Sequence, residues 1–70
     1  MTIDEAFETI LERNKNKIPC SASAVEMQAE CGASIGEINA RMRERYKAGE
    51  IGYFRSINEI RFYEDRIDRR

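Results

Sequence analysis

Histidine is absent from this 70-residue chain, and cysteine is scarce, with two residues. Histidine is the side chain that most often acts as a general base near neutral pH, so its absence excludes Ser-His-Asp and Cys-His catalytic arrangements. No glycine-rich phosphate loop or other catalytic signature stands in their place. We therefore expect a protein that is not an enzyme and that uses no cofactor.

The two cysteines, Cys20 and Cys31, do not have the spacing of a C-x-x-C redox pair. Without histidine, no zinc site of the Cys/His type can form either, and we predict no metal site. One disulfide between them stays open as an alternative. Free cysteines that behave as small apolar side chains are the favoured interpretation for a chain in the cytoplasm.

Long apolar runs are missing as well. No stretch approaches the roughly 18 residues that a membrane span requires, and the acidic start at Met1 to Glu5 lacks the basic and apolar regions of a signal peptide. Hydrophobic residues make up 41% of the chain and charged residues 36%, which suits a compact core with a charged surface. We expect a cytoplasmic globular protein with no membrane partner.

The length allows a single domain, because so short a chain buries only about 60% of its unfolded surface and cannot divide that between two cores. We place this domain at residues 1–64. The remaining residues, 65–70, are almost wholly charged, and we expect a flexible tail there.

The first predicted helix follows Thr2, which forms a capping-box pattern with Glu5. Its end is predicted near Asn16, because the residues after it are polar and Ile18-Pro19 disfavours helical geometry. One face of this helix carries the apolar residues Ile3, Ala6, Phe7, Ile10 and Leu11.

The second predicted helix is short, from Ala24 to Glu30. Ser23 and Glu26 form its capping pattern, and Gly32 ends it in the left-handed geometry that glycine adopts without penalty. The residues expected to face inward or to flank the core are Ala24, Val25, Gln28 and Ala29.

The third predicted helix runs from Ile35 to about Ala48, between a capping pattern at Ser34 and Glu37 and a stop at Gly49. Its inward face is predicted to hold Ile35, Ile38, Met42 and Tyr46. A helical wheel leaves these residues facing away: Gly36, Glu37, Ala40, Arg41, Arg43, Glu44 and Lys47.

A change of periodicity at Ile51 predicts a β-hairpin with strands at 51–55 and 60–63 and a turn at 56–59. One face of each strand would pack aromatic side chains on the helices. The other face would hold Arg55 and Arg61 out to solvent, although the register is left open.

The two helices joined by the tight turn at 30–34 form a helix-turn-helix, and the order of elements from Thr2 to Glu64 resembles the winged-helix family. The expected fold class is therefore α+β, mostly α: a three-helix winged helix-turn-helix with a C-terminal β-hairpin wing. In that family the third helix usually reads the DNA major groove and the wing touches the backbone or the minor groove. The resemblance implies these roles for the third helix and for Arg55 and Arg61.

The candidate DNA-binding residues divide into two groups. Those expected nearest the bases are Ser34, Gly36 and Asn39, where Asn39 suits an adenine edge and the helix start suits a phosphate. Those expected to contact phosphates are Arg41, Arg43, Lys47, Arg55 and Arg61.

The charge distribution favours DNA as the partner. Residues 1–34 hold six acids and three bases, whereas residues 35–63 hold six bases and four acids. The predicted reading helix and wing are thus the basic part of an otherwise acidic chain. The excess is small, so we expect one copy to bind weakly and with strong salt dependence, and a homodimer on two half-sites is one way to compensate.

We therefore expect a small DNA-binding protein, either a transcriptional regulator or an accessory DNA-binding factor. The alternative is a winged-helix module that binds another protein, favoured by the chain pI of about 5.5 and by Glu37 and Glu44 on the third helix. The helix charges also fit a solvated face with i,i+4 pairs, and Arg55 and Arg61 fit charges that guard a strand edge against aggregation.

Overall fold

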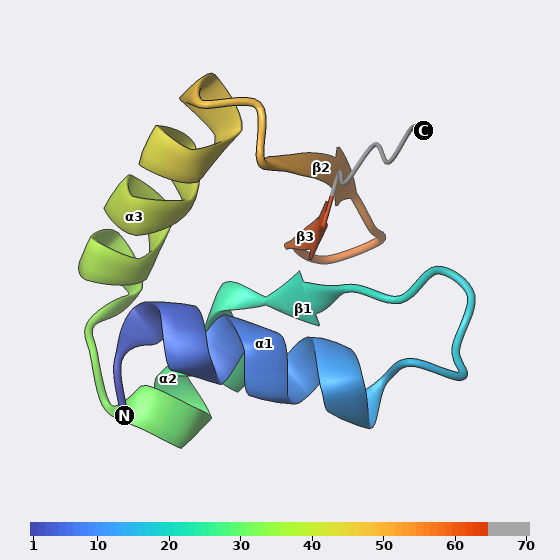
Figure 1. Cartoon of the computed structure of the whole chain (residues 1–70), viewed down its shortest axis with the longest axis horizontal. Coiled ribbons are helices and arrows are strands. Elements are labelled where there is room, and N and C mark those ends of the chain that lie inside the picture. The colour runs from blue at the N-terminus through green and yellow to red at the C-terminus, as the bar shows by residue number, and fades with distance from the viewer. Residues whose placement is uncertain (65–70) are drawn as a thin grey trace.

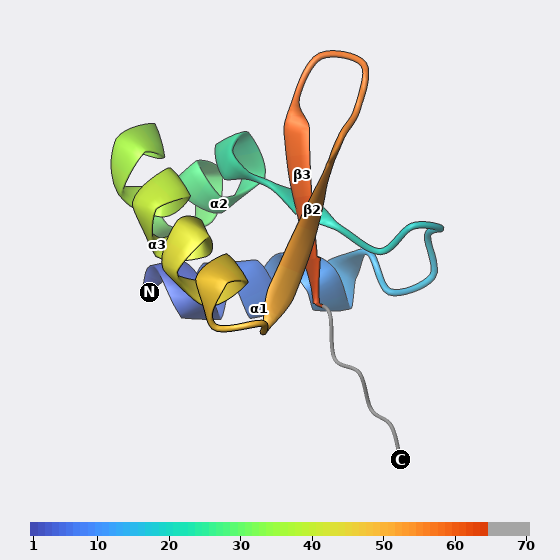
Figure 2. The same cartoon turned by 90° about the horizontal axis from the view of Figure 1, so that it is seen from above.

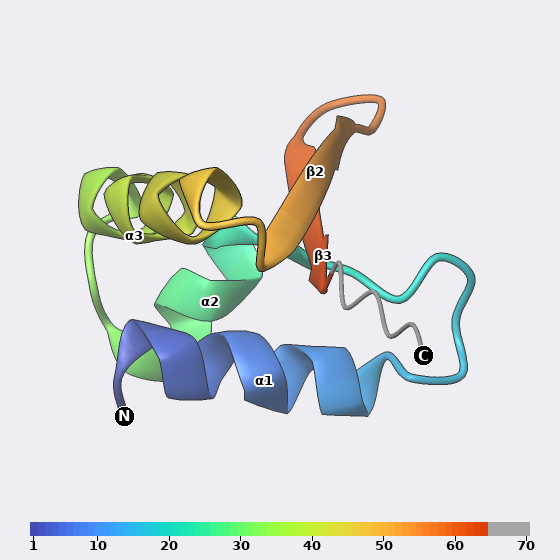
Figure 3. The ribbon, with the colours of Figure 1, turned by 45° about the horizontal axis from the view of Figure 1, so that its top comes forward.

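A computed structural model describes residues 1–64, and the predicted charged tail at 65–70 lies outside the described residues. Within 1–64 the chain forms three helices and one three-stranded antiparallel sheet, an α+β fold that is mostly α, as predicted. The elements in order are α1 (Ile3–Arg13), β1 (Ala22–Ser23), α2 (Ala24–Cys31), α3 (Ile35–Lys47), β2 (Ile51–Arg55) and β3 (Ile60–Glu64). In Figure 3, α2 lies between α1 and α3, and the β2–β3 hairpin extends away from all three helices.

The starts of the helices follow from local hydrogen bonds that the sequence predicts correctly. Each N-cap hydroxyl accepts a hydrogen bond from the backbone N–H three residues later, and the glutamate at that position accepts one from the N-cap N–H. The three capping boxes are Thr2 with Glu5, Ser23 with Glu26 and Ser34 with Glu37.

Glycines end the second and third helices, also as predicted. Gly32 caps α2 with φ 76°, and Gly49 follows α3 with φ 81°. The N–H of Gly49 donates to the Tyr46 carbonyl, and the N–H of Glu50 donates to the Arg45 carbonyl, both at 3.0 Å. This pair of bonds is a Schellman motif, which turns the chain sharply from α3 toward β2.

The predicted end of the first helix is wrong by three residues. α1 stops at Arg13, and Asn14 is its C-cap. The Asn14 side chain is buried, and its amide donates a 2.9 Å hydrogen bond to the Ser21 carbonyl. This long-range bond fixes the helix end, and the local sequence around Asn16 contains no sign of it.

The strand β1 is an element that the sequence analysis misses. Ala22 pairs with Phe62 and Ser23 pairs with Arg61, so the sheet has the order β1-β3-β2. Two residues are too few to show strand alternation, and alanine is not enriched in strands. The segment after Ile18-Pro19 thus pairs with β3 as the third strand of the sheet and leads directly into α2.

The core lies between α1, α2, α3 and the base of the hairpin. Its buried apolar residues are Ala6, Phe7, Ile10, Leu11, Ala22, Met27, Ile38, Met42, Ile51 and Phe62. All four of the buried α1 positions are among those predicted. Both cysteines are free and partly buried, in agreement with the favoured interpretation.

The predicted inward face of the second helix is largely wrong. Met27 is buried, Ala24 and Cys31 pack against the core, and Val25 is 64% exposed. Gln28 and Ala29 are exposed too. Spacings of three and four place residues 24, 27 and 31 on one side of a helix. The helix has only about two turns and few apolar residues, so the sequence does not distinguish this buried side clearly from the others.

In α3, Ile38 and Met42 are buried as predicted, but Tyr46 is 49% exposed. The side chain that turns inward at this end of the helix is Arg45, which is 15% exposed. Its guanidinium carbon lies 5.4 Å from the centre of the Phe7 ring, within cation–π range. At 100° per residue, position 45 lies about 20° from the direction of Ile38 and position 46 about 80° away, so the arginine takes the inner place.

The hairpin register separates the two arginines that were expected to share a face. Arg55 pairs with Ile60, and Phe54 pairs with Arg61, so Arg55 and Arg61 point to opposite sides of the sheet. The expectation that both point to solvent is wrong. Figure 2 shows the turn between β2 and β3 projecting beyond the helices, while the other end of the hairpin lies against them.

Candidate nucleic-acid interface

The outward side of α3 is a ridge of small and basic residues, which we call the α3 ridge: Gly36, Ala40, Arg43 and Lys47. All four are exposed, and their spacings of four, three and four place them opposite the buried Ile38. Neither Arg43 nor Lys47 forms an ion pair with another residue of 1–64. The ridge thus has small residues, Gly36 and Ala40, in its first half and two unpaired cations, Arg43 and Lys47, in its second half.

Ser34 and Asn39, which were predicted to lie near the bases, are exposed at the N-terminal part of α3. The Ser34 oxygen accepts the Glu37 N–H at 3.1 Å in the capping box, which leaves its O–H as a donor. Asn39 lies about 100° from Ile38 around the helix, on the same flank as Tyr46. Together with Gly36, these residues border the start of the α3 ridge.

The acidic residues of α3 lie beside the ridge, on the flank that faces α1. Glu37 is held in the capping box with Ser34, and Glu44 pairs with Arg41 at 3.1 Å. Both are about 100° or more from the direction of Ile38, on the side away from Tyr46. The two acids are therefore engaged within the chain and do not interrupt the α3 ridge.

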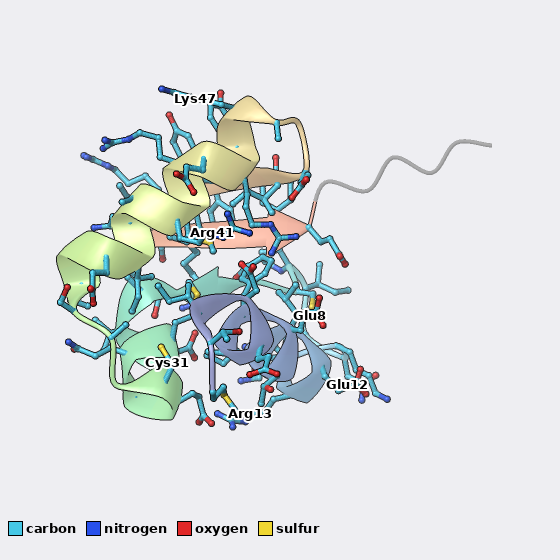
Figure 4. All side chains as sticks on the ribbon, turned by 60° about the vertical axis from the view of Figure 1, so that its left-hand side comes forward. Glu8, Glu12, Arg13, Cys31, Arg41 and Lys47 are labelled. Atoms are coloured by element: carbon cyan, nitrogen blue, oxygen red, sulfur yellow. The ribbon has the colours of Figure 1, made fainter. Side chains whose placement is uncertain are left out.

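Arg41 joins α3 to α1 and is not part of the ridge. Its guanidinium donates to both carboxylate oxygens of Asp4, at 3.0 and 2.7 Å. The hydrogen bond from Arg41 holds the pKa of Asp4 below its usual range, against the opposing effect of burial, and the charge of Arg45 adds to the lowering. These two bonds to Asp4, together with the one that Arg41 donates to Glu44, raise the pKa of Arg41. Figure 4 shows Arg41 between α3 and α1, with Lys47 toward the end of α3 that lies farther from α1.

Arg61 is also engaged within the fold. Its guanidinium donates to the Ser21 hydroxyl at 2.7 Å and the Ser21 carbonyl at 3.0 Å, and it pairs with Glu26 and Glu59. Burial lowers the pKa of Arg61, but the hydrogen bonds and charges of the two glutamates outweigh burial and raise it. The side chain is 19% exposed, so Arg61 ties β3 to β1 and α2 and does not reach outward from the wing.

Arg55 is the wing residue that does face solvent. It is exposed near the hairpin turn and has no ion-pair partner in the described part of the chain. Strand alternation places it on the same face as Tyr53.

Two tyrosines, one of them the Tyr46 that was predicted to face inward, connect α3 to the wing. Tyr46 and Tyr53 have ring centres 5.1 Å apart at 60°, and they are 49% and 52% exposed. Tilted aromatic pairs of this kind are favourable, so the contact sets the angle between helix and hairpin. We call this half-exposed pair the helix–wing corner.

The surface of α1 differs in charge from that of α3. Glu8 and Glu12 lie on α1 (Figure 4) and line a shallow hollow with Lys15 and Glu64. Such an acidic surface would repel phosphates. The basic and acidic sides of the molecule are thus carried by different helices.

No helix within 1–64 has the length and apolar character to cross a membrane. Across the same residues, no group of three or more cysteine or carboxylate side chains is placed to hold a metal ion. Comparisons with protein-family models, with curated proteins and with solved structures found no match to this chain.

Proposed function

We propose that the protein is a winged-helix DNA-binding protein of the cytoplasm, acting as a transcriptional regulator or accessory DNA-binding factor. In this proposal α3 enters the major groove with the α3 ridge toward the bases. The β2–β3 hairpin lies across the neighbouring phosphate backbone.

The observation that carries the proposal is how the cations are used. Five described basic residues, Arg13, Lys15, Arg41, Arg45 and Arg61, are held in ion pairs within the chain. Of the described lysines and arginines without such a pair, Arg43, Lys47 and Arg55 lie on the α3 ridge and the wing, and Lys17 lies in the loop after α1. Unpaired cations grouped on a helix and an adjacent hairpin match the electrostatic footprint of a DNA-binding surface.

The roles follow from the chemistry of each side chain. Arg43 projects from the middle of the ridge and suits the two acceptors of a guanine edge, while Asn39 suits adenine. Lys47 and Arg55 suit phosphates on either side of the helix–wing corner. Gly36 brings no side chain, so the helix backbone can approach the groove closely there.

The proposal is tested by fluorescence anisotropy with a labelled mixed-sequence duplex at low salt. We expect Arg43→Glu with Lys47→Glu to reduce the affinity at least tenfold, because two phosphate or base contacts become repulsive. The circular dichroism spectrum and melting temperature should stay unchanged, since both side chains are exposed and unpaired.

The control is Lys15→Glu with Lys17→Glu, which changes the net charge equally at two exposed residues after α1, one of which, Lys15, forms a surface ion pair with Glu12. In Figure 1 the segment that follows α1 lies on the side of the hairpin away from α3. This variant should bind DNA nearly as well as the unchanged protein. Equal losses in the two variants would mean that only total charge matters, and the assignment of α3 as the reading helix would then be wrong.

A protein-binding module is the second candidate, and exposed apolar groups near the wing favour it. Tyr46, Tyr53 and Ile60 are each more than 40% exposed, and aromatic residues are enriched in protein interfaces. Against it, Glu44 is paired with Arg41, and both Glu37 and Glu44 lie on the flank of α3 beside the α3 ridge and not on it. If no duplex binds at low salt, this second function takes precedence.

A further inference from the structure

The hairpin turn carries an apolar side chain that neither the core nor the proposed phosphate contacts use. Ile57 is 94% exposed at the end of the wing. A single exposed aliphatic residue is common on protein surfaces and requires no special explanation. Ile57, however, extends a row of exposed apolar groups.

That row runs along the face of the hairpin that looks toward α3. Tyr53 contacts Tyr46 in a tilted pair at the helix–wing corner, and Ile60, the cross-strand partner of Arg55, is 43% exposed on the same face. Tyr53 and Ile60 are diagonal neighbours in this register. The row therefore leads from the end of α3 to Ile57 at the turn.

The charges beside the row identify the partner that suits it. Arg55 lies on the same face with no described ion-pair partner, and Asn58 follows Ile57 with an amide that can donate and accept. The acid of the turn, Glu59, is paired with Arg61 at 2.7 Å. An exposed aliphatic group flanked by a cation and an amide matches the side chains that proteins insert into the DNA minor groove.

The dimensions of the hairpin agree with this partner. A strand of five residues spans about 16 Å at about 3.3 Å per residue. The major groove is about 12 Å wide. A hairpin that starts beside the end of α3 can thus carry its turn past one phosphate strand into the adjacent minor groove.

We propose that the protein bends DNA by inserting Ile57 between base pairs in the minor groove, with Arg55 on the flanking phosphate. This inference rests on the proposed DNA-binding function. A wedge of this kind partly unstacks one base step and kinks the duplex toward the major groove. Pyrimidine–purine steps unstack most easily, so binding should favour a duplex with a TA step under the wing.

The experiment combines anisotropy, which measures binding, with energy transfer between dyes at the two ends of a mixed-sequence duplex, which measures bending. The unchanged protein should bind and should increase the energy transfer. Ile57→Ser should still bind, with a loss of no more than about tenfold, and should leave the energy transfer near that of free DNA. Ile57→Met keeps an apolar wedge and should restore most of the bend.

Ile18→Ser is the matched control, because Ile18 is 98% exposed in the loop before β1 and does not line the hollow at the hairpin turn that holds Ile57. It should bind and bend DNA as the unchanged protein does. Binding without any bend, or an undiminished bend with Ile57→Ser, would overturn the wedge and leave DNA binding intact. Absence of any binding would instead overturn the proposed function, so the two failures are distinguishable.

Discussion

Arg61 makes a set of hydrogen bonds that only a guanidinium can make at once. Its three nitrogens reach Ser21, Glu26 and Glu59, which belong to the segment before β1, to α2 and to the hairpin turn. A lysine ammonium is a point charge without this planar fork, so it cannot satisfy the same partners together. The residue therefore serves the fold, whereas Arg55, six positions earlier in the chain, is exposed and forms no ion pair within the described residues.

This division of roles predicts opposite results for two similar substitutions. Arg61→Ala should lower the free energy of unfolding by about 2 kcal/mol, because charge-assisted hydrogen bonds are lost and the Ser21 carbonyl loses a donor. Arg55→Ala should change stability by less than about 0.5 kcal/mol, since the side chain is exposed and unpaired within the described residues. Urea denaturation followed by circular dichroism measures both.

DNA affinity should follow the reverse order under native conditions. Arg55→Ala should weaken binding several-fold through one lost phosphate contact. Arg61→Ala should weaken DNA binding only indirectly, to the extent that the loss of its hydrogen bonds lets the β2–β3 hairpin shift relative to α2. If Arg55→Ala destabilises the fold as much as Arg61→Ala does, the two roles assigned here are wrong.

The junction between α1 and α3 depends on Asp4, which accepts from Arg41 and lies 3.5 Å from Arg45. The pKa of Asp4 is lowered in the folded protein, mainly by the hydrogen bond from Arg41. A lowered carboxyl pKa stabilises the fold at pH values above the unfolded pKa of about 3.9, and this stabilisation disappears as the pH falls through the folded pKa. The α1–α3 contact is therefore weaker in acid.

Asp4→Asn should reproduce the acid state at neutral pH. We expect a loss of no more than about 1 kcal/mol in the free energy of unfolding at pH 7, because the Asp4 side chain is 40% exposed. The difference from the unchanged protein should shrink as the pH falls below about 3.9 and disappear once Asp4 is protonated in the folded protein as well. Glu8→Gln is the control, since Glu8 is exposed and forms no ion pair within the described residues, and it should change the free energy of unfolding at pH 7 by less than about 0.5 kcal/mol. A difference that does not shrink as the pH is lowered would mean that Asp4 acts through packing.

The helices were predictable and part of the sheet was not, for a physical reason. Capping boxes and glycine stops are local, so Ser23, Ser34 and Gly49 fix helix ends through residues close in sequence. β1 exists because Ala22 and Ser23 meet Phe62 and Arg61, about forty positions away. No short window of sequence contains that pairing.

The candidate site shows the same limit. The exposed residues of α3 could be predicted because helix geometry alone decides their direction; they are Gly36, Asn39, Arg43 and Lys47. Arg41 and Arg61 are engaged in the fold because their partners, Asp4 and Ser21, come from distant segments. The contact between Tyr46 and Tyr53 depends on the sharp turn after α3. The periodicity of the sequence therefore could not predict it.

Within residues 1–64, internal ion pairs engage five of the nine lysines and arginines, and in the proposed function the remaining cations limit how many phosphates this part of one copy can neutralise. Arg43, Lys47 and Arg55 are the unpaired cations of the proposed surface among the described residues. Each phosphate contact contributes about −0.9 to the slope of log affinity against log salt. Three contacts therefore predict a slope of about −3 for one copy, and two copies on adjacent half-sites would double it.

The most direct test of which cations contact DNA compares two basic residues on the same helix. Lys47→Gln and Arg41→Gln each remove one positive charge, but Lys47 is unpaired and exposed whereas Arg41 is bonded to Asp4 and Glu44. Lys47→Gln should reduce the steepness of the salt slope by about 1, whereas Arg41→Gln should leave it unchanged. Anisotropy titrations across a range of salt concentrations measure both slopes. An equal change in the two would mean that DNA approaches the α1 side of α3 as well, and the α3 ridge would then be only part of the bound surface.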